Sequence, residues 1–127
     1  MTGVQTCALP IYLLPELSED VDCGHNVKST VFIEVHCEYR SDGPDEMKPV
    51  GEVEYIQTIA DSAASGPTKA AAGIIGHADL KLGEGVRPVL EAMQAASPNR
   101  FRGVRHSVWY DERPALANRD LKCAFRS

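Results

Sequence analysis

Three short apolar runs alternate with three stretches of helical periodicity, and this alternation restricts the possible folds more than any other feature. The apolar runs lie near residues 30–35, 70–75 and 101–106, and the helical spacing of apolar residues falls within 12–23, 53–63 and 84–96. The first run is β-branched and nearly unbroken, which is typical of a strand covered on both faces. The pattern predicts βα units with a parallel sheet, an α/β fold.

The first eleven residues differ from the rest because they match a short-read sequencing adapter translated in frame. A GTG start codon would give Met1, and the last base of the adapter would begin the codon of Tyr12. Artefactual segments are excluded before the fold is considered. We therefore expect 1–11 to be a translated adapter and 12–127 to be a fragment of a larger α/β domain, since three strands cannot close a barrel.

Composition and charge exclude several classes of protein. The chain is 43% hydrophobic and 24% charged, as is usual for a globular protein, and no apolar run is long enough to span a bilayer. The net charge of −5 argues against nucleic acid as a partner. Without Cys7 of the adapter, the cysteines Cys23, Cys37 and Cys123 are odd in number and lack CxxC spacing, which predicts reduced thiols and a cytoplasmic protein.

Three blocks of sequence, taken in order with the segments that join them, carry a family likeness. The blocks are Gly24-His25-Asn26-Val27 leading into Thr30-Val31-Phe32-Ile33-Glu34, then Ala72-Gly73-Ile74-Ile75-Gly76-His77-Ala78-Asp79-Leu80, then Arg100-Phe101-Arg102-Gly103-Val104-Arg105-His106-Ser107, joined through Tyr39-Arg40-Ser41-Asp42-Gly43-Pro44 and Pro49-Val50-Gly51-Glu52. Together they resemble the amidohydrolase-2 group of the amidohydrolase superfamily, from about Tyr12 to about Asp111. This resemblance implies a partial (βα)8 TIM barrel with about three βα units, equivalent to strands 2, 3 and 4.

The resemblance also implies a metal-dependent hydrolase with its site at the carboxyl-terminal ends of the strands. The parent enzyme would hydrolyse a small carboxylated, lactone-like or amide-like substrate with water activated by zinc or a similar divalent metal. The family's usual ligands are a His-x-His pair ending strand 1, histidines after strands 5 and 6, and an aspartate after strand 8. No two of the four histidines here are two residues apart, so these ligands are expected outside the chain and the fragment is expected to be inactive.

Two other interpretations stay open. One is a non-catalytic α/β fragment, or a barrel protein without a metal site. The other is a flavodoxin-like domain, which has the same alternation of strands and helices but would need a Gly-rich phosphate loop that the sequence lacks.

Four residues are candidates for binding substrate. Arg105 and His106 end the third run; the guanidinium could hold a substrate carboxylate, and neighbouring strand residues point to opposite faces, so one of the two is expected to face the site. Glu34 belongs either to a polar network at the barrel mouth or to an ion pair with a nearby cation. His77 is either oriented by Asp79 or structural, with Asp79 as a helix cap.

Two further groups of residues are not expected to form a functional site. The acidic cluster from Asp42 to Glu46, together with Glu52 and Glu54, is interpreted as a solvated loop and a helix N-terminus, where the helix dipole favours negative charge. A Cys2His2 zinc site is not expected, because the spacing of its would-be ligands is unlike that of known zinc modules. Those ligands would be Cys23, His25, His36 and Cys37.

Overall fold

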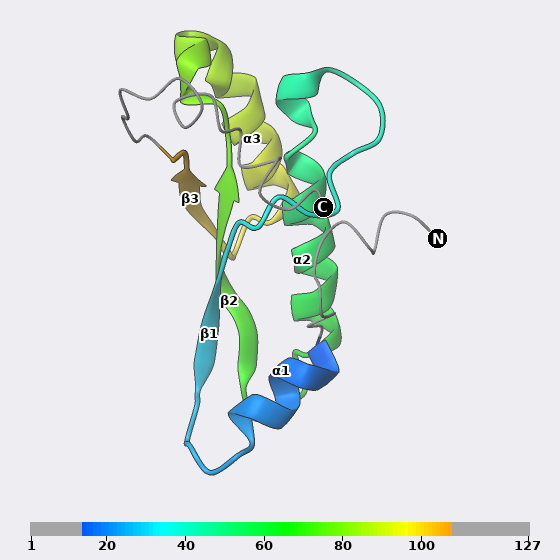
Figure 1. Ribbon diagram of the computed structural model, residues 1–127, viewed down its shortest axis with the longest axis vertical. Helices are drawn as coiled ribbons and strands as arrows, with labels where there is room; N and C mark the ends of the chain where they lie inside the picture. The colour runs from blue at the N-terminus through cyan, green and yellow to red at the C-terminus, as the bar shows by residue number, and fades with distance from the viewer. Residues whose placement is uncertain (1–13, 108–127) are drawn as a thin grey trace, which may run out of the picture.

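The computed structural model describes residues 14–107, so the adapter prediction for residues 1–11 lies outside the described residues (Figure 1). The elements follow the predicted order of alternating helices and strands. They are α1 (Leu14–Val21), β1 (Ser29–Ile33), η2 (Asp45–Met47), α2 (Val50–Ser62), β2 (Lys69–His77), η3 (Leu80–Val86), α3 (Arg87–Ala96) and β3 (Phe101–Arg105). The three strands form one sheet in the order β1-β2-β3 with both pairs parallel, which confirms the α/β prediction.

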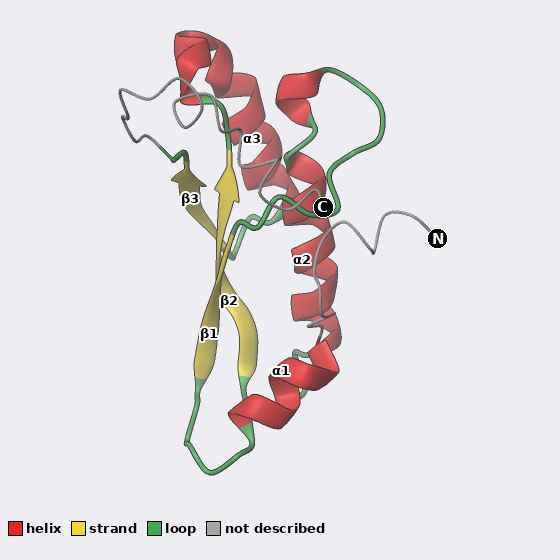
Figure 2. Cartoon of the chain, viewed as in Figure 1, coloured by secondary structure: helices red, strands yellow, loops and turns green. Residues whose placement is uncertain are grey.

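The helices α2 and α3 pack against the same face of the sheet (Figure 2). In α2, apolar residues at helical spacing form a buried stripe, and in α3 the buried residues are one turn apart after a proline in the first turn. The core joins these two stripes to the middle strand and to the start of β3. Its central members are Val50, Val53, Ile56, Ile74, Val89, Met93 and Phe101.

Small residues on β2 let the two helices approach the sheet closely. A Cβ added at Gly76 would lie 3.1 Å from both Met93 Sδ and a Val53 methyl group. That separation is tighter than ordinary van der Waals contact, so the helix layer rests directly on the backbone of the middle strand.

The opposite face of the sheet is open, which corrects one prediction from the sequence. The first strand was expected to be covered on both faces, but Val31 and Ile33 are 61% and 46% exposed, while Phe32 between them packs against the core. The run has no polar alternation even though only its helix-facing side is partly buried.

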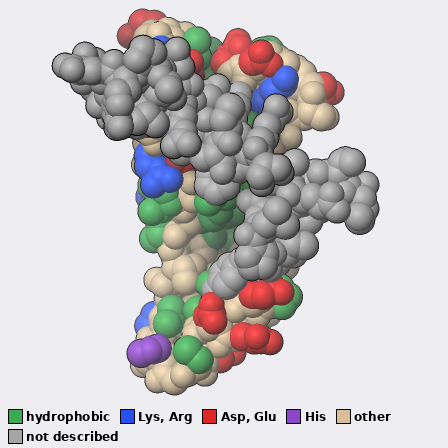
Figure 3. All heavy atoms as spheres, viewed as in Figure 1, with side chains coloured by type: hydrophobic (Ala, Val, Ile, Leu, Met, Phe, Trp, Pro, Cys, Tyr) green, Lys and Arg blue, Asp and Glu red, His purple; other side chains and the backbone are tan. Residues whose placement is uncertain are grey.

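One other detail departs from the predicted pattern. The helix expected from residue 84 begins as an α-helix at Arg87, because the preceding η3 contains Gly83 at φ 57° and ψ −127°, outside the helical region. At the other end of the molecule, α1 lies near the start of β1 and β2 and carries a group of exposed acidic side chains (Figure 3).

Candidate functional site

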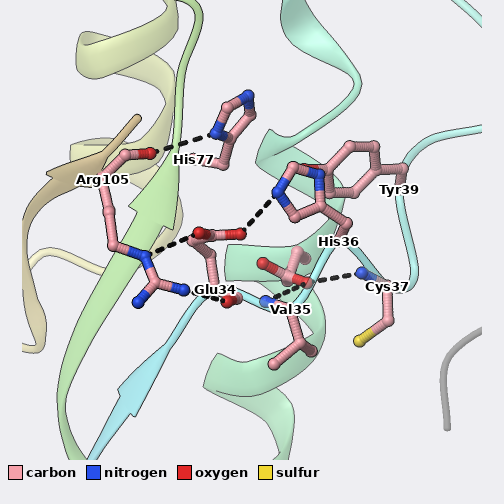
Figure 4. A network of polar contacts seen from close by, with 8 residues as sticks. Glu34, Val35, His36, Cys37, Tyr39, His77 and Arg105 are labelled. Carbon is pink, nitrogen blue, oxygen red and sulfur yellow. Dashed lines mark hydrogen bonds and ion pairs between the residues drawn. The ribbon is translucent and has the colours of Figure 1, made fainter. Parts of the chain in front are cut away.

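Five polar side chains gather where the three parallel strands end, and we refer to this group as the rim; Figure 4 shows four of them, Glu34, His36, His77 and Arg105. Glu34 and His36 directly follow β1, His77 ends β2, and Arg105 and His106 come from the end of β3. The carboxyl ends of parallel strands are where α/β proteins build their sites, because the loops that follow can turn over the sheet edge.

Glu34 and Arg105 are joined across the middle strand. Arg105 Nε donates to Glu34 Oε1 at 2.8 Å, and Arg105 Nη2 donates to the backbone carbonyl of Glu34 at 3.1 Å. The Glu34 side chain is only 2% exposed, whereas that of Arg105 is 53% exposed. Glu34 is therefore a buried carboxylate paired with a cation, and it is also a member of a polar network at the strand ends.

The second oxygen of the Glu34 carboxylate faces His36. Glu34 Oε2 and His36 Nε2 lie 2.8 Å apart, close enough for an ion pair. They are not aligned for a hydrogen bond, so within residues 14–107 both buried atoms are without a hydrogen-bond partner. The other ring nitrogen, His36 Nδ1, lies 3.1 Å from the Tyr39 hydroxyl.

The backbone of this segment has an uncommon conformation. His36 and Glu38 have φ of 62° and 51°, in the left-handed region that residues other than glycine rarely adopt. Such conformations persist where surrounding contacts hold them, and they occur often at functional sites.

His77 occupies the centre of the rim. Its Nδ1 contacts the Arg105 carbonyl at 3.0 Å, and its ring centroid lies 4.6 Å from that of His36 and 5.4 Å from that of His106. Burial lowers the pKa of His77 below the usual 6.5, and the neighbouring His36 acts in the same direction, so the ring is neutral at pH 7.

Asp79 and His106 hold the loop that follows β2. The Asp79 carboxylate accepts from the backbone N–H of Lys81 at 3.0 Å and caps η3, as one of the two sequence interpretations had it. His106 Nδ1 accepts from the N–H of Leu80 at 3.0 Å, and the nearest Asp79 oxygen is 3.8 Å away. Asp79 therefore contacts the ring of His106 instead of orienting His77.

Glu52 was predicted to be solvated, and the structure shows that this is wrong. Its side chain is 1% exposed and its Oε2 accepts from the backbone N–H groups of Cys37, at 2.6 Å, and Val35, at 3.3 Å. Burial raises its pKa to about 7, although the two N–H groups oppose that rise. Burial likewise raises the pKa of Tyr39 far above its usual value, with the nearby Glu52 and Glu34 carboxylates adding to the rise. Glu52 thus fastens the site segment to α2.

Sequence reasoning identified Glu34, His77, Arg105 and His106 as candidates but missed His36 and Glu52 as members of the site. His36 had a weak signal, since it stands two residues after a glutamate at a strand end. Glu52 had none, because its partners are 15 and 17 residues away along the chain.

Three of these residues form a candidate metal-binding group. One ligand atom each from Glu34, His36 and His77 lie within 4.8 Å of one another. The group differs from the ligand set that the family resemblance implies, since it contains no His-x-His pair. A set of two imidazoles and one carboxylate suits a transition metal such as zinc or iron better than calcium or magnesium.

No family model, curated protein or solved structure matches this chain. The fold and the rim define an α/β protein whose parallel sheet gathers ionisable side chains at its carboxyl-terminal edge. Within the part of the chain that the structure describes, none of the helices has the length and apolar character needed to cross a membrane.

Proposed function

We propose that this chain is part of a metal-dependent hydrolase of the amidohydrolase superfamily, in which it forms three consecutive βα units of a (βα)8 barrel. The observation that carries the proposal is the rim itself. Four candidate residues meet at the carboxyl-terminal edge of the parallel sheet, where such barrels have their sites: Glu34, His77, Arg105 and His106.

The arrangement of layers is that of consecutive βα units in a barrel. Consecutive strands are neighbours, and α2 and α3 lie on one face, as the outer helices of a barrel do. The open face presents the apolar side chains Val31 and Ile33. In a barrel this face is the interior, where branched apolar side chains fill the space between strands.

Arg105 is the residue that we assign to the substrate. Its Nε and Nη2 are engaged by Glu34, yet about half of the side chain is exposed beside the rim. A guanidinium fixed in this way keeps its charge and its orientation, so its remaining N–H groups can receive a substrate carboxylate. His77 lies beside Arg105, with its Nδ1 in contact with the Arg105 carbonyl.

The residues of this chain do not fit the metal site of the family, whose His-x-His pair and later ligands have no counterpart among the four histidines here. In such hydrolases the metal lowers the pKa of a bound water and polarises a carbonyl. We assign no step of the reaction to that metal in this chain. The contribution that we propose for the rim is binding and orientation of the substrate.

The test is to recover the gene upstream of Tyr12, express the complete reading frame, and measure hydrolysis of small carboxylated lactones and amides. We expect an upstream strand ending in His-x-His. We also expect Arg105→Gln to raise KM by about 10- to 100-fold with a smaller change in kcat, because it removes a contact made in both ground and transition states. Arg102→Gln, on the same strand, is the matched control. Absence of a His-x-His strand together with absence of hydrolysis would overturn the proposal.

One observation favours the non-catalytic alternative, namely that Glu34 and Arg105 neutralise each other. A purely structural pair would make Arg105→Gln lower stability without a selective effect on KM. Zinc or manganese that the full-length protein, purified from metal-supplemented culture, binds in addition to any ion at Glu34, His36 and His77 would exclude that alternative.

A further inference from the structure

We infer that Glu34, His36 and His77 form a binding site for one divalent transition metal ion within this chain, distinct from the metal site that the family resemblance implies. This inference goes beyond the proposed hydrolase and does not depend on it, because it concerns side chains that the structure itself brings together. One ligand atom from each of the three residues lies within 4.8 Å of the others.

The carboxylate of Glu34 has one oxygen available for an ion. Oε1 accepts from Arg105 Nε, while Oε2 points toward His36 and, among the described residues, has no hydrogen-bond partner. The side chain is 2% exposed, so water does not replace the missing partner freely. A buried carboxylate oxygen without a partner is energetically unfavourable, and a cation bound to it removes that penalty.

His36 supplies the second ligand atom, Nε2, which faces Glu34 Oε2. Nε2 is buried, lies 2.8 Å from Glu34 Oε2, and lacks a hydrogen bond within residues 14–107. Two ligand atoms at this separation fit a metal ion at ~2.0–2.1 Å from each, with an angle near ~85° at the metal. Tyr39 contacts the other nitrogen, Nδ1, which is how metal-bound imidazoles are commonly oriented.

His77 supplies the third ligand, and any movement that this requires is small. Two ligands of one ion at ~2.1 Å can be no more than ~4.2 Å apart, so a separation of up to 4.8 Å requires an approach of less than ~1 Å. Rotation about the side-chain bonds of His77 can provide this movement. The contact of Nδ1 with the Arg105 carbonyl leaves Nε2 to bind the ion. Three protein ligands would leave at least one position of the ion for water.

Proton sharing is the rival explanation for the contact between Glu34 and His36. A protonated His36 would form an ion pair with the carboxylate and would need no metal. The two explanations differ in what they require of His77, which an ion pair between Glu34 and His36 does not involve.

The experiment titrates Zn²⁺ into the 127-residue chain by calorimetry and Co²⁺ by visible absorption, at pH 7.5. We expect one equivalent to bind, with a cobalt spectrum of low coordination number. Glu34→Gln, His36→Gln and His77→Gln should each weaken binding by at least the ~10- to 100-fold that loss of an outer hydrogen-bond partner causes in known metal sites. His25→Gln, which alters an exposed histidine outside the rim, is the matched control and should bind like the parent chain.

A second measurement needs no variant and keeps the test valid if a substitution disturbs folding. In NMR spectra of the histidine rings, Zn²⁺ should shift the signals of His36 and His77 and leave those of His25 in place. Absence of stoichiometric binding, binding that survives all three substitutions, or shifts confined to His25 would overturn the metal site. None of these results bears on hydrolysis by the full-length protein, so failure here is distinguishable from failure of the proposed function.

Discussion

Glu52→Gln should remove a pH dependence of stability that the buried carboxylate creates. In the folded chain the pKa of Glu52 is raised from 4.5 to about 7, chiefly by burial. A carboxyl group whose pKa is raised on folding stabilises the fold fully below its unfolded pKa, and this contribution is lost as the pH rises through 7. The difference between the unfolded and folded pKa values corresponds to about 3 kcal/mol of unfolding free energy, and most of this stability is lost between pH 5 and pH 9.

The assay is urea-induced unfolding followed by far-UV circular dichroism at pH 5, 7 and 9. We expect the free energy of unfolding of the Glu52→Gln variant, relative to the parent chain, to increase by about 2–3 kcal/mol from pH 5 to pH 9. His77 has a lowered pKa and stabilises the fold more at higher pH, which opposes Glu52. Because His77 is present in both proteins, its effect cancels in the difference.

Glu54→Gln is the control for this experiment, since Glu54 lies on the same helix and is partly exposed beside Arg40. It should retain the pH dependence of the parent chain. A Glu52→Gln variant whose stability runs parallel to the parent from pH 5 to pH 9 would refute the reasoning, as would a gain that appears only at low pH.

Three further predictions concern the surroundings of the rim. Arg105→Ala should lower the free energy of unfolding by about 1–3 kcal/mol in urea titrations, because Glu34 keeps a buried charge without its cation; an unchanged midpoint would contradict this. Gly51→Ala should destabilise by more than about 2 kcal/mol despite the better helix propensity of alanine, since its Cβ would lie 2.6 Å from Arg40 N; Gly85→Ala, whose Cβ has only an ordinary contact, is the control for thermal unfolding. The ring of His77 should titrate below pH 6.5 by NMR, and a midpoint above 6.5 would show that burial does not dominate there.

Local patterns in the sequence were sufficient for the layout of the fold. The three apolar runs lie within or across β1, β2 and β3, and turn residues mark where the helices stop. The ionisable site residues at the ends of two strands were also predictable, because Glu34 interrupts one apolar run and Arg105 lies at the end of another. Such features depend on residues close together in the chain, which a periodicity analysis can detect.

The remaining features depend on contacts between distant segments. Glu52 has the sequence context of a solvated helix start, yet it is buried because Val35 and Cys37 present their N–H groups to it. His36 contacts His77 only after β1 and β2 pair in their observed register. The Glu52 contacts leave no local trace in the sequence and His36 leaves only a weak one, so the candidate metal group could be found only once the strands had been placed.

The close contact at Gly76 links the rim to the helix layer mechanically. The backbone of β2 at this position supports Val53 and Met93, so one added methyl group would press α2 and α3 away from the sheet. Since α2 also carries Glu52, that displacement would pull on the segment that bears His36. A substitution beneath the sheet could therefore adjust the spacing of the rim by fractions of an ångström. This makes position 76 a place from which the site can be tuned by protein engineering without altering any residue that a ligand would touch.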